Sequence, residues 1–181
     1  MKLNARKSIL NTVKIALFAA IISVCAMIAI PFPVPLTLQT FGVFAAFFTL
    51  GGKNGSISVL LYIAIGSVGL PVFSGFTAGF GRLFDLTGGF IWGFLVAALA
   101  FWALEALARK KRFFIPISAA ISLLLIYVTG CVQFALVSSS DGAEIGILSA
   151  VVGCVLPFVI PDIIKIFLAY IISRRIRKFT E

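Results

Sequence analysis

An acid and a base stand three residues apart near the end of the chain, in Pro161-Asp162-Ile163-Ile164-Lys165. On a helix this spacing puts Asp162 and Lys165 on one face, where they can pair with each other or bind a polar ligand together. The carboxylate would accept hydrogen bonds from N–H groups, and the ammonium would meet an anion or a carbonyl. A second interpretation stays open, in which Asp162 offsets the helix dipole and Lys165 extends outward to the membrane interface.

Other polar side chains are weaker candidates. Gln39 and Thr37 follow a proline-rich segment, and a glutamine there can offer a ligand both a donor and an acceptor. The alternative is that Thr37 caps the start of a helix. Arg82 is also counted among the candidate ligand contacts, whereas Glu105 lies one turn before Arg109 and is expected to form an ordinary surface pair.

Several kinds of chemistry are excluded by what the chain lacks. It has no histidine, which removes HExxH metalloproteases, histidine triads and imidazole metal ligands. Gly51-Gly52-Lys53-Asn54 lacks the upstream glycine and the Ser or Thr of a Walker A loop, so the chain should not hydrolyse ATP. The three cysteines stand singly in apolar surroundings, without the close pairing of a metal or redox site. We therefore expect neither an enzyme nor a bound metal or cofactor.

The composition places these residues in a membrane. Of the 181 residues, 61% are hydrophobic and 12% are charged, with a mean hydropathy of +1.18. Soluble domains contain only roughly 45–50% apolar residues. No long polar stretch leaves room for a soluble catalytic domain, so we expect a single membrane-embedded domain over residues 1–181.

Apolar runs predict an all-α polytopic protein with six transmembrane helices. A helix needs about 20 apolar residues to cross the hydrocarbon core. The long runs are 8–30, 88–107, 113–137 and a last one, 158–173. Pro161 would suit the first helical position of the last helix, which puts Asp162 in its first turn. Two shorter runs, 38–50 and 55–70, are either two short helices or a re-entrant pair.

The basic residues predict the orientation of these helices. Three groups of four lie before or at the start of the first run, between 88–107 and 113–137, and at the end of the chain. Together with Lys53 they make thirteen of the fifteen Lys and Arg residues, and six helices put all of them on one side. The positive-inside rule makes that side cytoplasmic, with both termini on it. Placement at the ends of apolar runs also favours a membrane over nucleic acid as the reason for the net charge of +9.

Three segments remain for the outer side, at 31–37, 67–87 and 138–157. Within the first, residues 31–35 should be extended because the prolines lack N–H donors and restrict their predecessors. The second mixes glycines and phenylalanines, which suits close approach to a flat, partly apolar molecule or, alternatively, a loop anchored in the interface. Within the third, 144–156 is apolar but too short to cross the membrane.

Six blocks of sequence occur in an order and spacing typical of one family. They are Pro33-Val34-Pro35-Leu36-Thr37-Leu38-Gln39-Thr40, Leu50-Gly51-Gly52-Lys53-Asn54-Gly55, Gly69-Leu70-Pro71-Val72-Phe73, Thr87-Gly88-Gly89-Phe90, Tyr127-Val128-Thr129-Gly130 and Pro157-Phe158-Val159-Ile160-Pro161-Asp162-Ile163-Ile164-Lys165. Over nearly the whole chain the sequence resembles the BioY family, the biotin-specific substrate-binding (S) components of energy-coupling factor (ECF) transporters.

The resemblance implies a six-helix protein of the bacterial cytoplasmic membrane that binds biotin near the outer face. It would deliver biotin inward together with a transmembrane coupling protein and two ATPase subunits. The polar ligand contacts of the family map onto Asp162 and Lys165, with Asp162 expected at the ureido N–H groups and Lys165 at a ligand oxygen. The alternative function is a carrier or facilitator that works alone.

Two further family features map onto this chain. The glycine-rich loop falls at 75–81, which adds Gly75 and Thr77 to the expected ligand contacts. The alanine motif used against the coupling protein falls on Ala16 and Ala20, whose spacing lets another helix approach closely. The chain departs from the family at Leu86, where a proline is usual, and phenylalanines interrupt the glycines of its loop.

Overall fold

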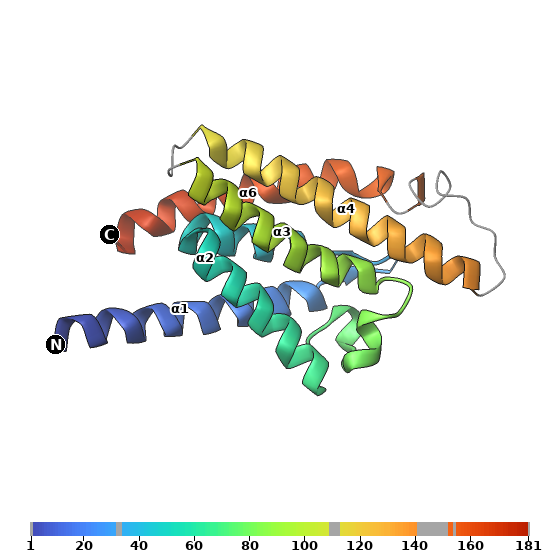
Figure 1. Ribbon diagram of the computed structural model, residues 1–181, viewed down its shortest axis with the longest axis horizontal. Helices are drawn as coiled ribbons and strands as arrows, with labels where there is room; N and C mark the ends of the chain where they lie inside the picture. The colour runs from blue at the N-terminus through green and yellow to red at the C-terminus, as the bar shows by residue number, and fades with distance from the viewer. Residues whose placement is uncertain (1, 32–33, 109–112, 141–151, 154, 181) are drawn as a thin grey trace.

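The architecture is a bundle of long helices. The structure, a computed structural model, describes every residue except 1, 32–33, 109–112, 141–151, 154 and 181. Within the described part, five helices are long and apolar enough to cross a membrane. They are α1 (Lys2–Met27), α2 (Gln39–Val68), α3 (Gly88–Leu107), α4 (Phe114–Ser140) and α6 (Leu156–Thr180). Both ends of the chain lie at the same end of the bundle (Figure 1). The prediction of a helical membrane protein is confirmed at this level.

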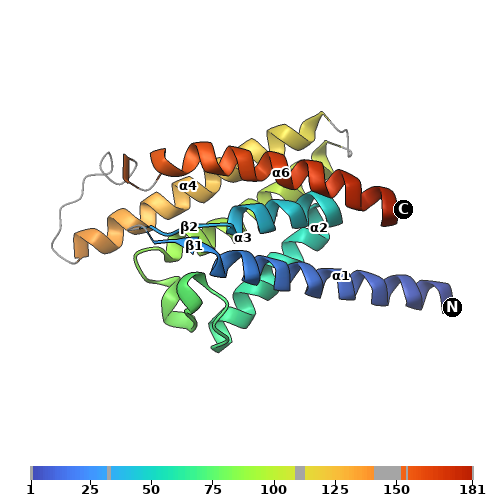
Figure 2. The ribbon, with the colours of Figure 1, turned by 180° about the vertical axis from the view of Figure 1, so that it is seen from behind.

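Helix α2 contains most of both short apolar runs, 38–50 and 55–70, which residues 51–54 separate in the sequence. It is interrupted at Gly51, whose φ of 80° and ψ of 167° are open to glycine and strained for other residues. The first half runs toward the end of the bundle that holds the termini, and the second half runs back (Figures 1 and 2). Glu105 Oε2 accepts a hydrogen bond from the Gly52 N–H at 2.5 Å, so it satisfies a donor at the start of the second half. The sequence did not predict this contact.

A short antiparallel ladder connects α1 to α2. Its strands are β1 (Ala29–Ile30) and β2 (Leu36–Thr37), with Ala29 opposite Thr37. The N–H of Leu38 donates to the carbonyls of Cys25 and Ile28, which ties the ladder to the end of α1. Strand geometry at 36–37 thus follows the segment 31–35 that was predicted to be extended, in which residues 32–33 lie outside the described part of the chain.

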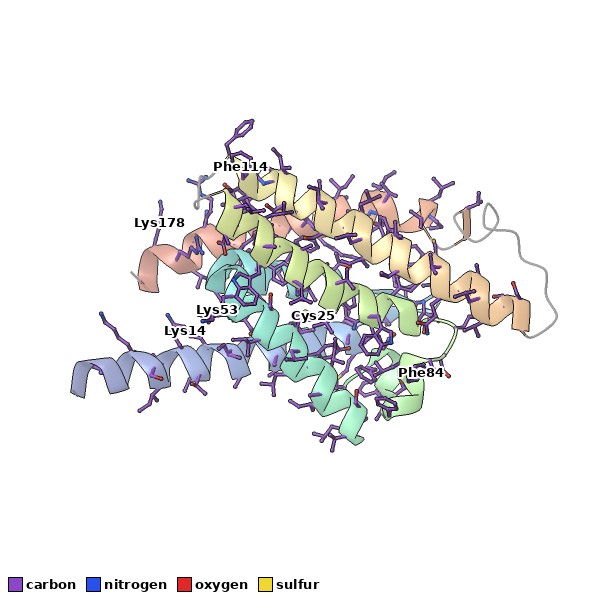
Figure 3. The ribbon with its side chains drawn as sticks, viewed as in Figure 1. Lys14, Cys25, Lys53, Phe84, Phe114 and Lys178 are labelled. Atoms are coloured by element: carbon purple, nitrogen blue, oxygen red, sulfur yellow. The ribbon has the colours of Figure 1, made fainter. Side chains whose placement is uncertain are left out.

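The segment between α2 and α3 folds back on the bundle through two 3₁₀ turns, η1 (Ser74–Phe76) and η2 (Phe80–Leu83). Phe73 is buried, and its ring meets that of Tyr62 at 5.6 Å between centroids. The Gly79 N–H donates to the Gly66 carbonyl at 2.8 Å. This segment therefore packs onto the bundle, while Phe76, Phe80 and Phe84 are exposed. Figure 3 shows Phe84 toward the end of the bundle opposite Lys178.

Helix α6 begins earlier than the sequence predicted. Pro161 lies inside the helix, so its prediction as the first helical residue was wrong. Proline is tolerated there because its missing N–H affects only the carbonyl four residues earlier, within the first two turns. Asp162 and Lys165 consequently lie about five residues, or roughly 7.5 Å, further along the helix than expected. The short apolar segment at 144–156 falls mostly outside the described residues.

Candidate functional site

Asp162 and Lys165 form a buried ion pair on α6. Lys165 Nζ lies 2.9 Å from Asp162 Oδ1, and the two residues are 8% and 4% exposed. The ammonium also donates to the carbonyl oxygen of Thr37 at 2.7 Å, across the bundle from α6. The interpretation in which Lys165 extends to the membrane interface is therefore excluded, because the side chain points into the bundle.

The second carboxylate oxygen of Asp162 is held by Tyr127 of α4, whose hydroxyl donates to Oδ2 at 2.8 Å. Tyr127 was part of a family block but was not predicted as a site residue. A hydroxyl-bearing ring in the otherwise apolar run 113–137 was the signal that could have found it. Lys165 has one N–H left after these two hydrogen bonds, and each oxygen of Asp162 keeps a lone pair. The pair can therefore accept further polar partners.

Gln39 and Thr37 lie beside this pair. Gln39 Nε2 donates to the hydroxyl oxygen of Tyr62 at 2.6 Å, and the Thr37 hydroxyl donates to Gln39 Oε1 at 3.2 Å. The Thr37 hydroxyl also accepts the Gln39 N–H at 3.2 Å. The N-cap residue of α2 is Leu38, so the alternative in which Thr37 caps the helix was wrong. Because Tyr62 accepts from Gln39, its own O–H proton is left available to another acceptor.

These groups surround a cavity of about 70 Å³, enough for roughly five water molecules. One part of its lining is polar, and the other is aromatic and aliphatic. The apolar part includes Phe73, Phe90, Phe94, Phe158, Val34 and Ile126. A cavity with this mixture of a few convergent polar groups and flat apolar walls is typical of a small-molecule site.

Ser74 is a further cavity residue that the sequence did not single out. Its Oγ is buried, and it finds no hydrogen-bond partner among the described residues. A buried hydroxyl without a partner is costly, so a group that completes it is expected to bind beside it. No motif marks this serine, because its role follows only from the way η1 folds onto the cavity.

The seven predicted contacts are not all brought together. Five of them line the cavity: Asp162, Lys165, Gln39, Thr37 and Arg82. Thr77 lies behind the cavity wall, where its hydroxyl accepts from Arg82 Nε at 3.1 Å. Gly75, with a φ of 69°, shapes the turn that carries Ser74 and is not part of the lining. Arg82 also pairs with Asp85 at 2.6 Å, and both side chains are partly exposed.

Ala16 and Ala20 lie away from this site. Both are exposed on α1, whereas Phe18, Ala19 and Ile22 of the same helix are buried. The two alanines thus leave a low surface of small residues on the outside of the bundle. Among the described residues there is also no group of three His, Cys, Asp or Glu side chains that could hold a metal ion.

The sequence and the overall fold are both similar to those of known proteins. The sequence model of the BioY family matches residues 1–181. The probable biotin transporter BioY of Pyrococcus horikoshii is 38% identical over 164 residues, covering 90% of this chain and 93% of the relative. The biotin transporter BioY of Thermotoga maritima is 36% identical over 171 residues, covering 92% and 95%. A crystal structure of the S-component for biotin from an ECF-type ABC transporter matches with a TM-score of 0.84 at 26% identity, covering 96% of this chain and 93% of that chain.

The mutual dependence of the buried charges gives a prediction about stability. Lys165→Met should lower the free energy of unfolding by about 3–5 kcal/mol, because it leaves the carboxylate of Asp162 buried without its cation. Unfolding in detergent micelles by titration with sodium dodecyl sulfate measures this change. Asp162→Asn combined with Lys165→Met should recover most of the loss, since no uncompensated charge remains. Equal losses in the single and double variants would contradict the prediction.

Proposed function

Because the chain belongs to the BioY family, we propose that it is the biotin-binding component of an ECF importer in the bacterial cytoplasmic membrane. The observation that carries the proposal is the buried Asp162–Lys165 pair, which lines a cavity between α6, α4 and the start of α2. The family consists of transport subunits, and the chain lacks the residues of a Walker A loop. ATP hydrolysis is therefore assigned to partner ATPases.

The chemistry of biotin suits the two kinds of cavity wall. Its ureido group has two N–H donors and a carbonyl, so Asp162 would accept from the N–H groups and the remaining N–H of Lys165 would bind the oxygen. Its compact, apolar rings would pack against Phe90 and Phe158. Arg82 would lie toward the carboxylate of the tail.

The proposed topology has six spans, with the two halves of α2 counted as separate spans and both termini in the cytoplasm. Support comes from the change of direction at Gly51 and from the thirteen basic residues that this arrangement puts on one side. The exposed Ala16 and Ala20 suit close approach of a helix from the coupling protein. The alternative is a carrier or facilitator that needs no partner.

A transport assay separates these two functions. Proteoliposomes that contain this chain alone should bind biotin without accumulating it against a gradient. Accumulation should require the coupling protein, both ATPases and ATP, because this chain has no energy source of its own. Uphill uptake by the chain alone would reject the ECF assignment in favour of a secondary carrier.

The proposed ligand contacts make a prediction about affinity. Asp162→Asn and Lys165→Ala should each weaken biotin binding by about 1–3 kcal/mol, through loss of charge-assisted hydrogen bonds in a partly dry site. Isothermal titration calorimetry on purified, folded protein measures the effect. Glu105→Gln, which alters a carboxylate outside this cavity, is the matched control and should leave the affinity unchanged. Full affinity in both site variants would remove the pair from the proposed site.

Ser74 allows a test that separates binding from folding. Ser74→Ala should weaken biotin binding by about 1 kcal/mol, because the hydroxyl gains its hydrogen bond only from the ligand. The same variant should not lower the thermal stability of the ligand-free protein. Ser67→Ala is the control, since the Ser67 hydroxyl already donates to the Ile63 carbonyl at 2.7 Å. A variant that loses stability and keeps its affinity would show that Ser74 is structural.

A further inference from the structure

A second cavity of about 800 Å³ lies at the end of the bundle that holds both termini. Residues of all five long helices line it, and none of them belongs to the lining of the proposed biotin site. Lys14, Lys53 and Lys178 come from three different helices and lie toward this end (Figure 3), whereas Phe84 lies toward the other. The second cavity is therefore separate from the site in which biotin is proposed to bind.

The charge on this cavity is strongly unbalanced. Its basic residues are Lys14, Lys53, Arg174, Arg177 and Lys178, and its one acid among the described residues is Glu105. The acid is already engaged, because it accepts the hydrogen bond from the Gly52 N–H at the interruption of α2. A site with several cations and one committed carboxylate favours an anionic ligand.

Part of the wall of this cavity is aromatic and accessible. Trp102 and Phe114 line it and are 41% and 42% exposed. Phe47 and Phe101 stack in the adjoining core with their centroids 4.9 Å apart, and both are buried. A soluble phosphate would use only the basic rim, whereas a molecule with an anionic head and an apolar tail would use both surfaces.

We infer that this cavity binds an anionic phospholipid of the inner leaflet, with the phosphate at Lys53 and Arg174 and the first part of an acyl chain against the aromatic wall. The inference rests on the proposed orientation, which puts this end of the bundle at the leaflet that carries anionic lipids. The lipid would fill the space between the turn of α2 and the end of α6, and so brace the cytoplasmic ends of the helices.

Native mass spectrometry of the purified full chain tests the inference. The protein is released from micelles that contain equal amounts of phosphatidylglycerol and phosphatidylcholine, and the retained lipid is counted. Wild type should retain phosphatidylglycerol preferentially. Lys53→Gln combined with Arg174→Gln should reduce this retention roughly tenfold, because two cations near the phosphate are lost. Glycerol 3-phosphate added in excess should displace little of the lipid, since it lacks the apolar part.

The control variant also removes two positive charges. Lys7 on α1 and Arg175 on α6 are exposed and do not line the cavity, so Lys7→Gln with Arg175→Gln should keep the lipid. Equal loss in both double variants, or no preference for phosphatidylglycerol in wild type, would overturn the inference. Displacement of the lipid by glycerol 3-phosphate, or by an acidic peptide of the partner subunits, would show that the cavity binds that molecule instead of a lipid. Biotin titrations on the same samples report separately on the proposed function.

Discussion

A buried carboxylate and a buried ammonium stabilise each other, and contacts from several parts of this structure hold one such pair in place. Asp162 and Lys165 lie on α6, yet their remaining partners come from elsewhere: Tyr127 from α4 and the carbonyl of Thr37 from the end of β2. Each of these contacts reduces the cost of burying charge inside an apolar bundle. Because the contacts do not use every donor and acceptor, the pair keeps the capacity to bind a ligand.

The interruption of α2 has a different role, since it lets one helix supply residues to both cavities. Gly51 allows the chain to reverse, and Glu105 satisfies the donor that the reversal exposes. The first half of α2 carries Gln39 to the polar cavity, and the turn carries Lys53 to the basic one. One glycine therefore fixes the relation between a site that suits a vitamin and a site that suits a lipid.

Much of this could be predicted from the sequence, because the strongest signals were local. The apolar runs predicted long helices, and the three-residue spacing of Asp162 and Lys165 predicted a shared face. The start of α6 was predicted too late, because Pro161 is compatible with both the first position and the second turn of a helix. The burial of the pair could not be decided locally, since it depends on Thr37 and Tyr127, which are far away along the chain.

The polar cavity also brought in residues with no local signal. Ser74 resembles any other loop serine until η1 packs onto the bundle. Glu105, which lies outside the polar cavity, was expected to pair with Arg109, and its contact with Gly52 had no local signal either. Conversely, Gly75 and Thr77 were expected as ligand contacts from the resemblance to the family, and they lie outside the cavity lining. The resemblance indicated the loop that contains Ser74, whereas the direction of each side chain depends on the fold.

The hydrogen bond from Lys165 to Thr37 joins residues 128 positions apart, and the one from Thr49 to Ser173 joins residues 124 apart. During synthesis, the early helices therefore cannot complete their packing until the last helix leaves the ribosome. Until then the Thr37 carbonyl lacks its contact with the Lys165 ammonium, and the polar cavity lacks the wall that α6 supplies.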